Sequence, residues 1–122
     1  MYEVGAPGLT DIIEGAVSVD SLGVLACTPT SEQIADMEKL LSLYLSGLPA
    51  DIELLILGCT HYPIISNIIL ENWRKLHRTE IKLIDPGAAA AERFGKYFER
   101  HGEFEVSRGG RVAVEFSGDY PL

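Results

Sequence analysis

The sequence predicts an α/β domain built as a three-layer, open and mostly parallel sheet with flanking helices. The apolar run Leu54–Leu57 is too short for a helix and ends at Gly58, which is typical of a strand buried on both faces. Strand and helix patterns alternate through the middle of the chain, which favours right-handed crossovers between parallel strands. With 122 residues, of which 47% are hydrophobic, the chain is long enough to bury one core. We therefore treat residues 1–122 as a single domain.

The amino-terminal part contains three predicted elements. Residues Tyr2–Val4 suit a short strand, and Ala6–Glu14 suit a loop that enters a short helix. The apolar segment Ser21–Thr28, which is followed by Pro29, is typical of a second buried strand. This strand would bring Cys27 to its carboxyl end.

Two helices and a further strand are predicted next. Thr30 and Gln33 form a capping-box pattern ahead of an apolar stripe that ends before Gly47. A second helix is predicted from Ile64 to His77, and its basic last turn would complement the helix dipole. The segment Ile81–Ile84 then suits a third buried strand.

The last part of the chain changes in character. Asp85–Gly87 predicts a turn into a helix that begins with four alanines at Ala88 and ends at Gly102. Asp85 could cap this helix or belong to a site, and the sequence favours neither. In Val112–Phe116 apolar residues alternate with other residues, which is typical of an edge or antiparallel strand.

Composition limits the classes of partner. The formal net charge of −8, with no stripe of lysine or arginine, argues against nucleic acid or an anionic membrane. The chain shows no secretory signal and no apolar run near 18 residues, and it has two cysteines 32 positions apart. These features predict a cytoplasmic, reducing location. The alternative, a disulfide between Cys27 and Cys59, would require an oxidising compartment.

The sequence predicts that the reactive side chains lie at the end of the central strand, Leu54–Leu57. Gly58 allows a tight turn that carries Cys59, Thr60 and His61, and Pro63 suits the first turn of the following helix. Ligands of open α/β sheets bind at the carboxyl ends of strands, and a helix N-terminus favours a thiolate. Cys27 has no such polar neighbours in sequence, so we interpret it as a small buried hydrophobe.

Several chemistries are compatible with a cysteine and a histidine at this spacing. A metal site is disfavoured, because Cys-x-His is not a usual zinc spacing and the remaining soft ligands are unpaired. A phosphatase-type loop is disfavoured because no arginine follows Pro63 closely. A cysteine hydrolase, with His61 as base and Asp85 or Glu14 orienting it, stays open, as does a purely structural pair.

The seven residues Leu57–Pro63, Leu-Gly-Cys-Thr-His-Tyr-Pro, resemble the signature of glutamate racemases in the aspartate/glutamate racemase superfamily. Leu83–Ala89 is similar to the segment that follows the next strand in that family. Ala6–Leu9 resembles, more loosely, the family's loop before a helix with an acidic residue.

This resemblance implies a fold and an activity. Glutamate racemases have two similar α/β domains with the active site between them, and they interconvert L- and D-glutamate without a cofactor or metal. The D-glutamate serves peptidoglycan precursor synthesis. Two cysteines act on opposite faces of the substrate, one as base and one as acid. The resemblance makes Cys59 one of these, Thr60 a substrate contact, His61 the group that assists Cys59, and Glu14 the acidic residue.

The resemblance also implies that part of the enzyme is missing. The sequence has neither an Asp-Ser-Gly opening nor a Cys-Asn-Thr segment, which would supply the opposing cysteine. We therefore expect a carboxyl-terminal portion, with residues 1–85 as the core of the second domain and residues 86–122 as a segment that returns to the first. Such a chain would be inactive alone, and would form homo-oligomers or associate with the missing domain. A binding fragment without catalysis is the alternative.

Overall fold

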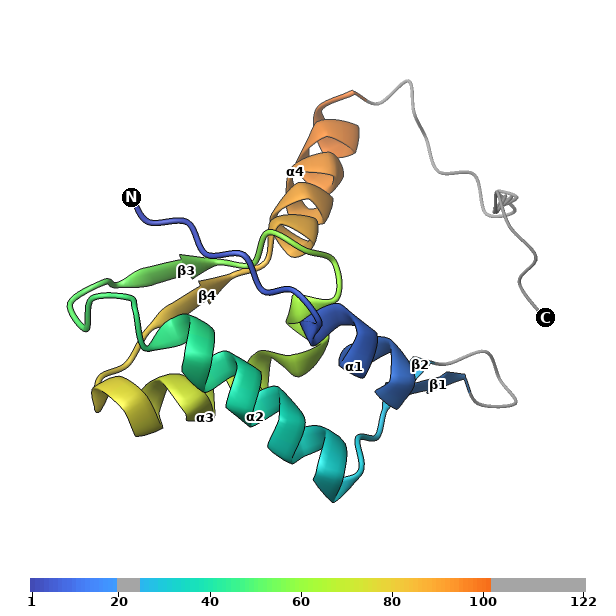
Figure 1. Cartoon of the computed structure of the whole chain (residues 1–122). Coiled ribbons are helices and arrows are strands. Elements are labelled where there is room, and N and C mark those ends of the chain that lie inside the picture. The colour runs from blue at the N-terminus through green and yellow to red at the C-terminus, as the bar shows by residue number, and fades with distance from the viewer. Residues whose placement is uncertain (20–24, 102–122) are drawn as a thin grey trace. The chain divides into compact units, whose positions relative to one another are not determined.

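The computed structural model describes residues 1–19 and 25–101, which form helices and short strands (Figure 1). The chain divides into two units, residues 1–90 and residues 91–122, and each is described by itself. In chain order the elements are α1 (Leu9–Ala16), β1 (Val17–Val19), β2 (Leu25–Cys27), α2 (Ser31–Leu45), β3 (Leu54–Ile56), the 3-10 helix η1 (Tyr62–Ile65), α3 (Ser66–His77), β4 (Lys82–Ile84) and α4 (Pro86–Arg100).

The predicted parallel pairing is confirmed for β3 and β4. Leu55 lies opposite Leu83 and Ile56 opposite Ile84, and the chain between the two strands forms η1 and α3. The ladder continues past β3, because the Leu57 N–H donates to the Ile84 carbonyl at 2.9 Å. The unit is therefore a small α/β fold with a parallel pair.

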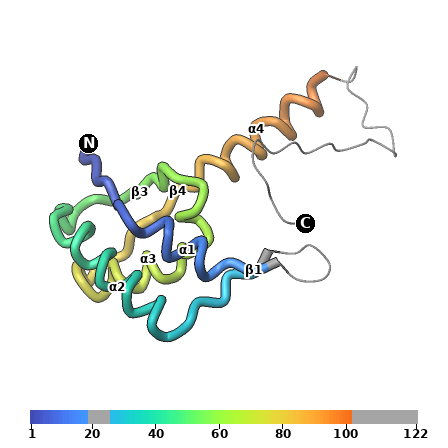
Figure 2. Tube along the Cα trace, turned by 45° about the vertical axis from the view of Figure 1, so that its right-hand side comes forward, coloured from blue at the N-terminus to red at the C-terminus, as the bar shows by residue number. Residues whose placement is uncertain are grey.

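The prediction of one mostly parallel sheet is wrong for the segment Ser21–Thr28. Its described strand β2 pairs antiparallel with β1, Val17 opposite Cys27, in a separate two-stranded sheet. The reason is length: only residues 20–24 separate the two strands, whereas a parallel connection needs a crossover of a dozen or more residues. In both views this hairpin lies away from the β3–β4 pair (Figures 1 and 2).

The prediction that the central strand is buried on both faces is also wrong for the described residues. Leu57 is buried, and Leu55 packs against the core, but Leu54 and Ile56 are 56% and 63% exposed. Alternate residues of a strand point to opposite faces, so one face of β3 is covered and the other is open. Helices α2 and α3 lie on the covered side (Figure 1).

The core of residues 1–90 lies between α1, α2, α3 and the covered face of β3. Trp73, Ile13 and Met37 are fully buried, one from each helix. The buried apolar residues are Leu9, Ile13, Ala16, Met37, Leu41, Leu45, Leu48, Leu57, Ile65, Ile69, Trp73 and Ile81. Their spacing on each helix is the three-and-four spacing that buries one face.

The predicted boundaries of α2 and α3 are largely confirmed. Thr30 and Gln33 form the capping box, with Gln33 N–H donating to Thr30 Oγ1 at 3.2 Å and Thr30 N–H donating to Gln33 Oε1 at 2.9 Å. The second predicted helix begins as η1, a 3-10 turn with Pro63 near its start, and continues as α3 to His77. Its last turn is basic, as expected.

At the two ends of the chain the outcome is mixed. The predicted helix after Ala6–Leu9 is α1, but Tyr2–Val4 does not form a strand. The helix predicted after Asp85 is α4, which ends at Arg100. The predicted strand Val112–Phe116 lies outside the described residues.

Candidate active site

A tight loop after β3 carries the predicted site residues. Leu57 is buried and bonded to β4, so the loop begins from an anchored position. The Tyr62 N–H donates to the Cys59 carbonyl at 3.3 Å, and the Ile64 N–H donates to the His61 carbonyl at 3.0 Å. These bonds turn the chain directly into η1, and they hold Cys59, Thr60 and His61 at the carboxyl end of the parallel pair.

Cys59 and His61 form a hydrogen-bonded pair, with 3.4 Å between Cys59 Sγ and His61 Nδ1. The His61 backbone N–H is the main cause that lowers the pKa of Cys59, followed by the His61 side chain, and burial opposes both. The hydrogen bond to Cys59 is in turn the main cause that raises the pKa of His61. Both directions make the thiolate and the imidazolium easier to form here than on the isolated side chains.

Glu14 completes this pair from helix α1. Its Oε1 lies 2.9 Å from His61 Nε2, and its charge also raises the pKa of His61. With Nε2 on Glu14 and Nδ1 on Cys59, both ring nitrogens are engaged and the ring orientation is fixed. The structure thus brings together Cys59, His61 and Glu14, although Glu14 and Cys59 are 45 positions apart in the sequence.

Thr10 is a neighbour of Cys59 that the sequence analysis missed. Its side chain is a lesser cause that lowers the pKa of Cys59, after the backbone and the side chain of His61. Thr10 and Glu14 are four residues apart on α1, so both lie on one face of the helix. That spacing relative to Glu14 is the sequence signal that could have identified Thr10.

A hollow of about 340 Å³ lies beside Cys59 and Thr60. Its other lining residues come from the end of β3, from Pro63, and from the turn that begins α4, including Asp85 and Gly87. Thr60 is exposed, so its hydroxyl is accessible from solvent. The predicted site residues Cys59 and Thr60 therefore border a shared space next to a helix N-terminus.

Asp85 acts as the cap of α4. Its Oδ1 accepts from the Gly87 N–H at 2.8 Å, and its carbonyl accepts from the Ala89 N–H at 3.1 Å. The acid that orients His61 is Glu14, so the alternative in which Asp85 does so is not the arrangement observed. Asp85 still lines the hollow beside Cys59.

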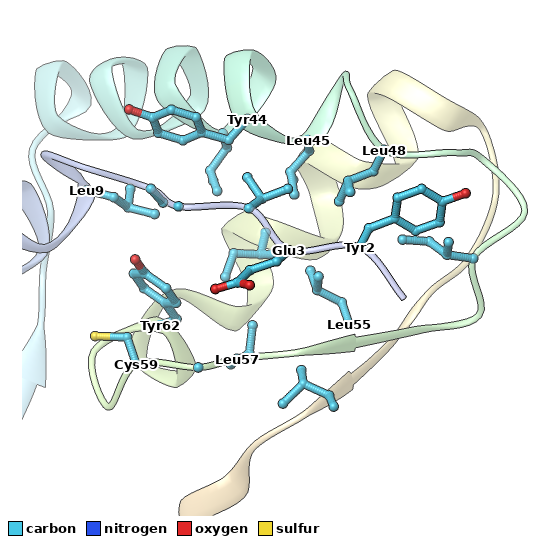
Figure 3. A pocket seen from close by; sticks show the side chains of 18 of the residues that line it. Tyr2, Glu3, Leu9, Tyr44, Leu45, Leu48, Leu55, Leu57, Cys59 and Tyr62 are labelled. Atoms are coloured by element: carbon cyan, nitrogen blue, oxygen red, sulfur yellow. The ribbon is translucent and has the colours of Figure 1, made fainter.

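A larger cavity of about 630 Å³ lies between the amino-terminal segment, α2 and β3, and it shares Leu57, Gly58 and Cys59 with the hollow (Figure 3). Figure 3 shows Cys59 and Tyr62 at one end of it, and Tyr2 and Leu48 at the other. The lining of both spaces is mostly apolar, but Thr60 lines the smaller hollow and not the larger cavity. The smaller hollow is therefore the space that joins Cys59 to the predicted substrate contact Thr60.

Cys27 takes no part in this arrangement. It is a free thiol, as is Cys59, so the alternative of a Cys27–Cys59 disulfide is wrong. Cys27 ends β2 and packs partly buried against the core, which agrees with its interpretation as a small hydrophobe. Within residues 1–19 and 25–101, no three His, Cys, Asp or Glu side chains are grouped to hold a metal ion. No helix in this described part could cross a membrane.

The fold and the site together define a class: a small α/β protein with an activated thiol, paired with an imidazole and a carboxylate, at the carboxyl end of a parallel strand. Sequence comparison adds the particular relatives, because the chain is similar to part of the glutamate racemases. It is 32% identical to glutamate racemase 2 of Caldanaerobacter subterraneus over 119 residues, which is 98% of this chain and 39% of that protein.

Shorter matches involve other glutamate racemases. The chain is 41% identical to the Fusobacterium nucleatum enzyme over 46% of its own length, and 50% identical to that of Chlorobium phaeobacteroides over 38%. These matches cover 19% and 15% of the two relatives, so the chain spans about two fifths or less of the proteins that it matches. No model of a known protein family matches the chain, and no solved structure does.

Proposed function

We propose that this chain supplies one half of a glutamate racemase active site, with Cys59 as one of the two groups that transfer the α-proton. The observation that carries the proposal is the Cys59–His61–Glu14 arrangement at the end of a parallel strand. The similarity to glutamate racemases, which extends over 98% of the chain in one relative, supports the choice of substrate.

The arrangement suits proton abstraction from carbon. The Cys59 thiolate takes the α-proton of the bound amino acid and becomes a thiol, which leaves a carbanion at the α-carbon. A thiol on the opposite face then donates its proton to that carbon and becomes a thiolate. The His61 imidazolium stabilises Cys59 as a thiolate between turnovers, and Glu14 stabilises the imidazolium.

Substrate recognition is assigned to the hollow beside Cys59. The Thr60 hydroxyl lines this hollow and can donate a hydrogen bond to a substrate carboxylate. A small acidic amino acid, glutamate, is the proposed substrate, and no cofactor or metal is needed for this chemistry. The proposed role is D-glutamate supply for peptidoglycan in the cytoplasm.

The chain alone is expected to be inactive. The second thiol must approach from the opposite face of the substrate, whereas Cys27 packs against the core in the β1–β2 hairpin. Removing one positioned acid or base typically costs about 10²- to 10⁴-fold in rate. L-Glutamate incubated with the pure chain should keep its circular dichroism signal. Steady, Cys59-dependent loss of that signal would show that Cys27 or a second copy completes the site.

A chimera tests the proposal directly. This chain replaces the aligned stretch of the Caldanaerobacter glutamate racemase 2, and formation of D-glutamate is followed by chiral chromatography. We expect Cys59→Ser to abolish racemisation, whereas the matched control Cys27→Ser retains it. A folded chimera that racemises equally well with Ser at position 59 would refute the role of Cys59.

A thiol hydrolase is a second candidate, favoured by the same three residues. Nucleophile, base and orienting acid lie in the order that such enzymes use, with Glu14 rather than Asp85 as the acid. This function predicts a Cys59-dependent burst of p-nitrophenol from p-nitrophenyl acetate, followed by turnover. A single stoichiometric burst without turnover would indicate a reactive thiol and exclude hydrolysis of this ester.

A further inference from the structure

The turn that begins α4 forms one wall of the hollow beside Cys59. With a volume of about 340 Å³, the hollow falls within the range of roughly 300–1,000 Å³ that is usual for small-molecule sites. Asp85 is the only carboxylate among the residues that line it, and none of them is a lysine or an arginine. The fixed charge that this wall offers to a ligand is therefore negative.

The backbone N–H groups at the start of α4 do little to offset that charge. Pro86 has no N–H, the Gly87 N–H donates to Asp85 Oδ1 at 2.8 Å, and the Ala89 N–H donates to the Asp85 carbonyl at 3.1 Å. Three of the first four helix positions therefore have no free donor for an anion. The polar group that the turn brings to the hollow is the Asp85 carboxylate itself.

This carboxylate is held at one oxygen and open at the other. Oδ1 is bound by the Gly87 N–H, and a Cβ at position 87 would lie only 3.2 Å from it, so glycine leaves room for the carboxylate close to the backbone. Oδ2 has no hydrogen-bond or ion-pair partner within residues 1–19 and 25–101. Asp85 is thus an oriented, half-buried carboxylate with one acceptor oxygen to spare.

We propose that Asp85 binds the α-ammonium group of the substrate through Oδ2, while Oδ1 continues to cap α4. The inference rests on the proposed function and names the part of the substrate that this wall recognises. The ammonium group is the positive group of glutamate, and it is attached to the carbon whose proton Cys59 removes. Binding it beside Cys59 holds the reacting carbon near the thiolate, and the substrate carboxylates are left to Thr60 and other donors.

The variant Asp85→Asn separates binding from capping. The amide oxygen of asparagine can still accept from the Gly87 N–H, and asparagine caps helices about as well as aspartate. Only the negative charge is lost. Asp36→Asn, which removes an exposed carboxylate from α2, is the matched control.

The experiment measures how strongly L-glutamate slows the alkylation of Cys59 by iodoacetamide in this chain. Glutarate, which has both carboxylates but no ammonium group, is the comparison ligand, and labelling of Cys27 in the same sample is the internal reference. We expect L-glutamate to protect Cys59 in the unaltered chain and in Asp36→Asn. Asp85→Asn should need a roughly 10- to 100-fold higher concentration, as for the loss of a charged hydrogen bond. Glutarate should protect the unaltered chain no better than it protects Asp85→Asn.

A role for Asp85 in capping alone predicts that L-glutamate protects Asp85→Asn as well as the unaltered chain, and that result would overturn the proposal. Failure of L-glutamate to protect the unaltered chain, or equal protection by glutarate, would also overturn it. If Asp85→Asn does not fold, the Gly87 amide of the unaltered chain is followed by NMR instead. Its signal should shift with L-glutamate and not with glutarate, and an equal response to both would count against the proposal.

Because protection does not depend on racemisation, the two proposals can fail separately. In an active chimera Asp85→Asn should raise KM more than it lowers kcat, since the ammonium group is bound in both the ground state and the transition state. An active chimera with an unchanged KM would refute only this inference. An inactive chimera, together with Asp85-dependent protection of Cys59, would refute the racemase proposal and leave this inference intact.

Discussion

At the scale of single residues, the reactivity of this chain concentrates at Cys59. Its pKa is lowered by the His61 backbone N–H and side chain, whereas Cys27 packs partly buried against the core. Iodoacetamide at neutral pH should therefore label Cys59 before Cys27, because the thiolate is the reacting form. Peptide mapping after limited treatment checks this, and earlier labelling of Cys27 would contradict it.

The effect of Glu14 can be tested through the pKa of His61, which it contacts. The carboxylate raises the pKa of His61, so Glu14→Gln should lower that pKa, because the neutral amide stabilises the imidazolium less. An NMR titration of the His61 ring protons measures the shift. Asp11→Asn removes a carboxylate from the first turn of the same helix and serves as the control. Equal shifts in both variants would mean that the contact with Glu14 has no specific effect.

The directions of the two shifts also determine the response to pH. Because the pKa of Cys59 is lowered, the stability that Cys59 contributes is present above its unfolded-state pKa and is lost as pH falls through the lowered value. Because the pKa of His61 is raised, the stability that His61 contributes is present below its unfolded-state pKa and is lost as pH rises through the raised value.

At the scale of elements, α2 supplies the clearest local test. Thr30 caps the helix with its hydroxyl, and Gln33 caps it in return. Thr30→Ala should lower the free energy of unfolding by about 1 kcal/mol, the typical cost of losing such a cap. Urea denaturation measures this change. Thr30→Ser retains the hydroxyl and should behave nearly as the original chain, and similar losses in both variants would exclude the cap as the cause.

At the scale of the whole molecule, the open face of β3 predicts association. Leu54 and Ile56 are more than half exposed, and β3 is paired on one edge only in the described sheet. Covering such side chains is worth roughly 1.5–3 kcal/mol each when burial is complete, and a free strand edge can pair with another chain. We therefore expect a dimer or higher oligomer in light scattering, formed with a second copy.

Two variants test whether the open face of β3, rather than nonspecific attraction between exposed apolar side chains, drives association. Ile56→Lys should shift the chain toward a monomer of 13.4 kDa, because a charge on the open face resists burial. Leu43→Lys alters a side chain of α2 with 66% exposure and should leave the assembly unchanged. A chain that is already monomeric at all concentrations would show that the open face does not drive association.

Local patterns in the sequence were sufficient for a large part of this structure. The capping box of α2, the basic last turn of α3 and the parallel strands on either side of α3 follow from residues that are neighbours in the chain. The loop with Cys59, Thr60 and His61 also follows from residues that are neighbours in the chain, because a short apolar strand, a glycine and a proline specify where it begins and ends.

The tertiary structure alone decided how distant residues meet. The short connection at residues 20–24 turned a predicted parallel strand into a hairpin, and the helices of the described unit covered only one face of β3. The sequence itself determined the Cys59–His61 pair, since the two residues share one loop. The contact of Glu14 with that pair depends on how the buried face of α1 packs against the core. Hydrophobic periodicity predicts which face of the helix is buried, but it does not predict which residue the other face meets.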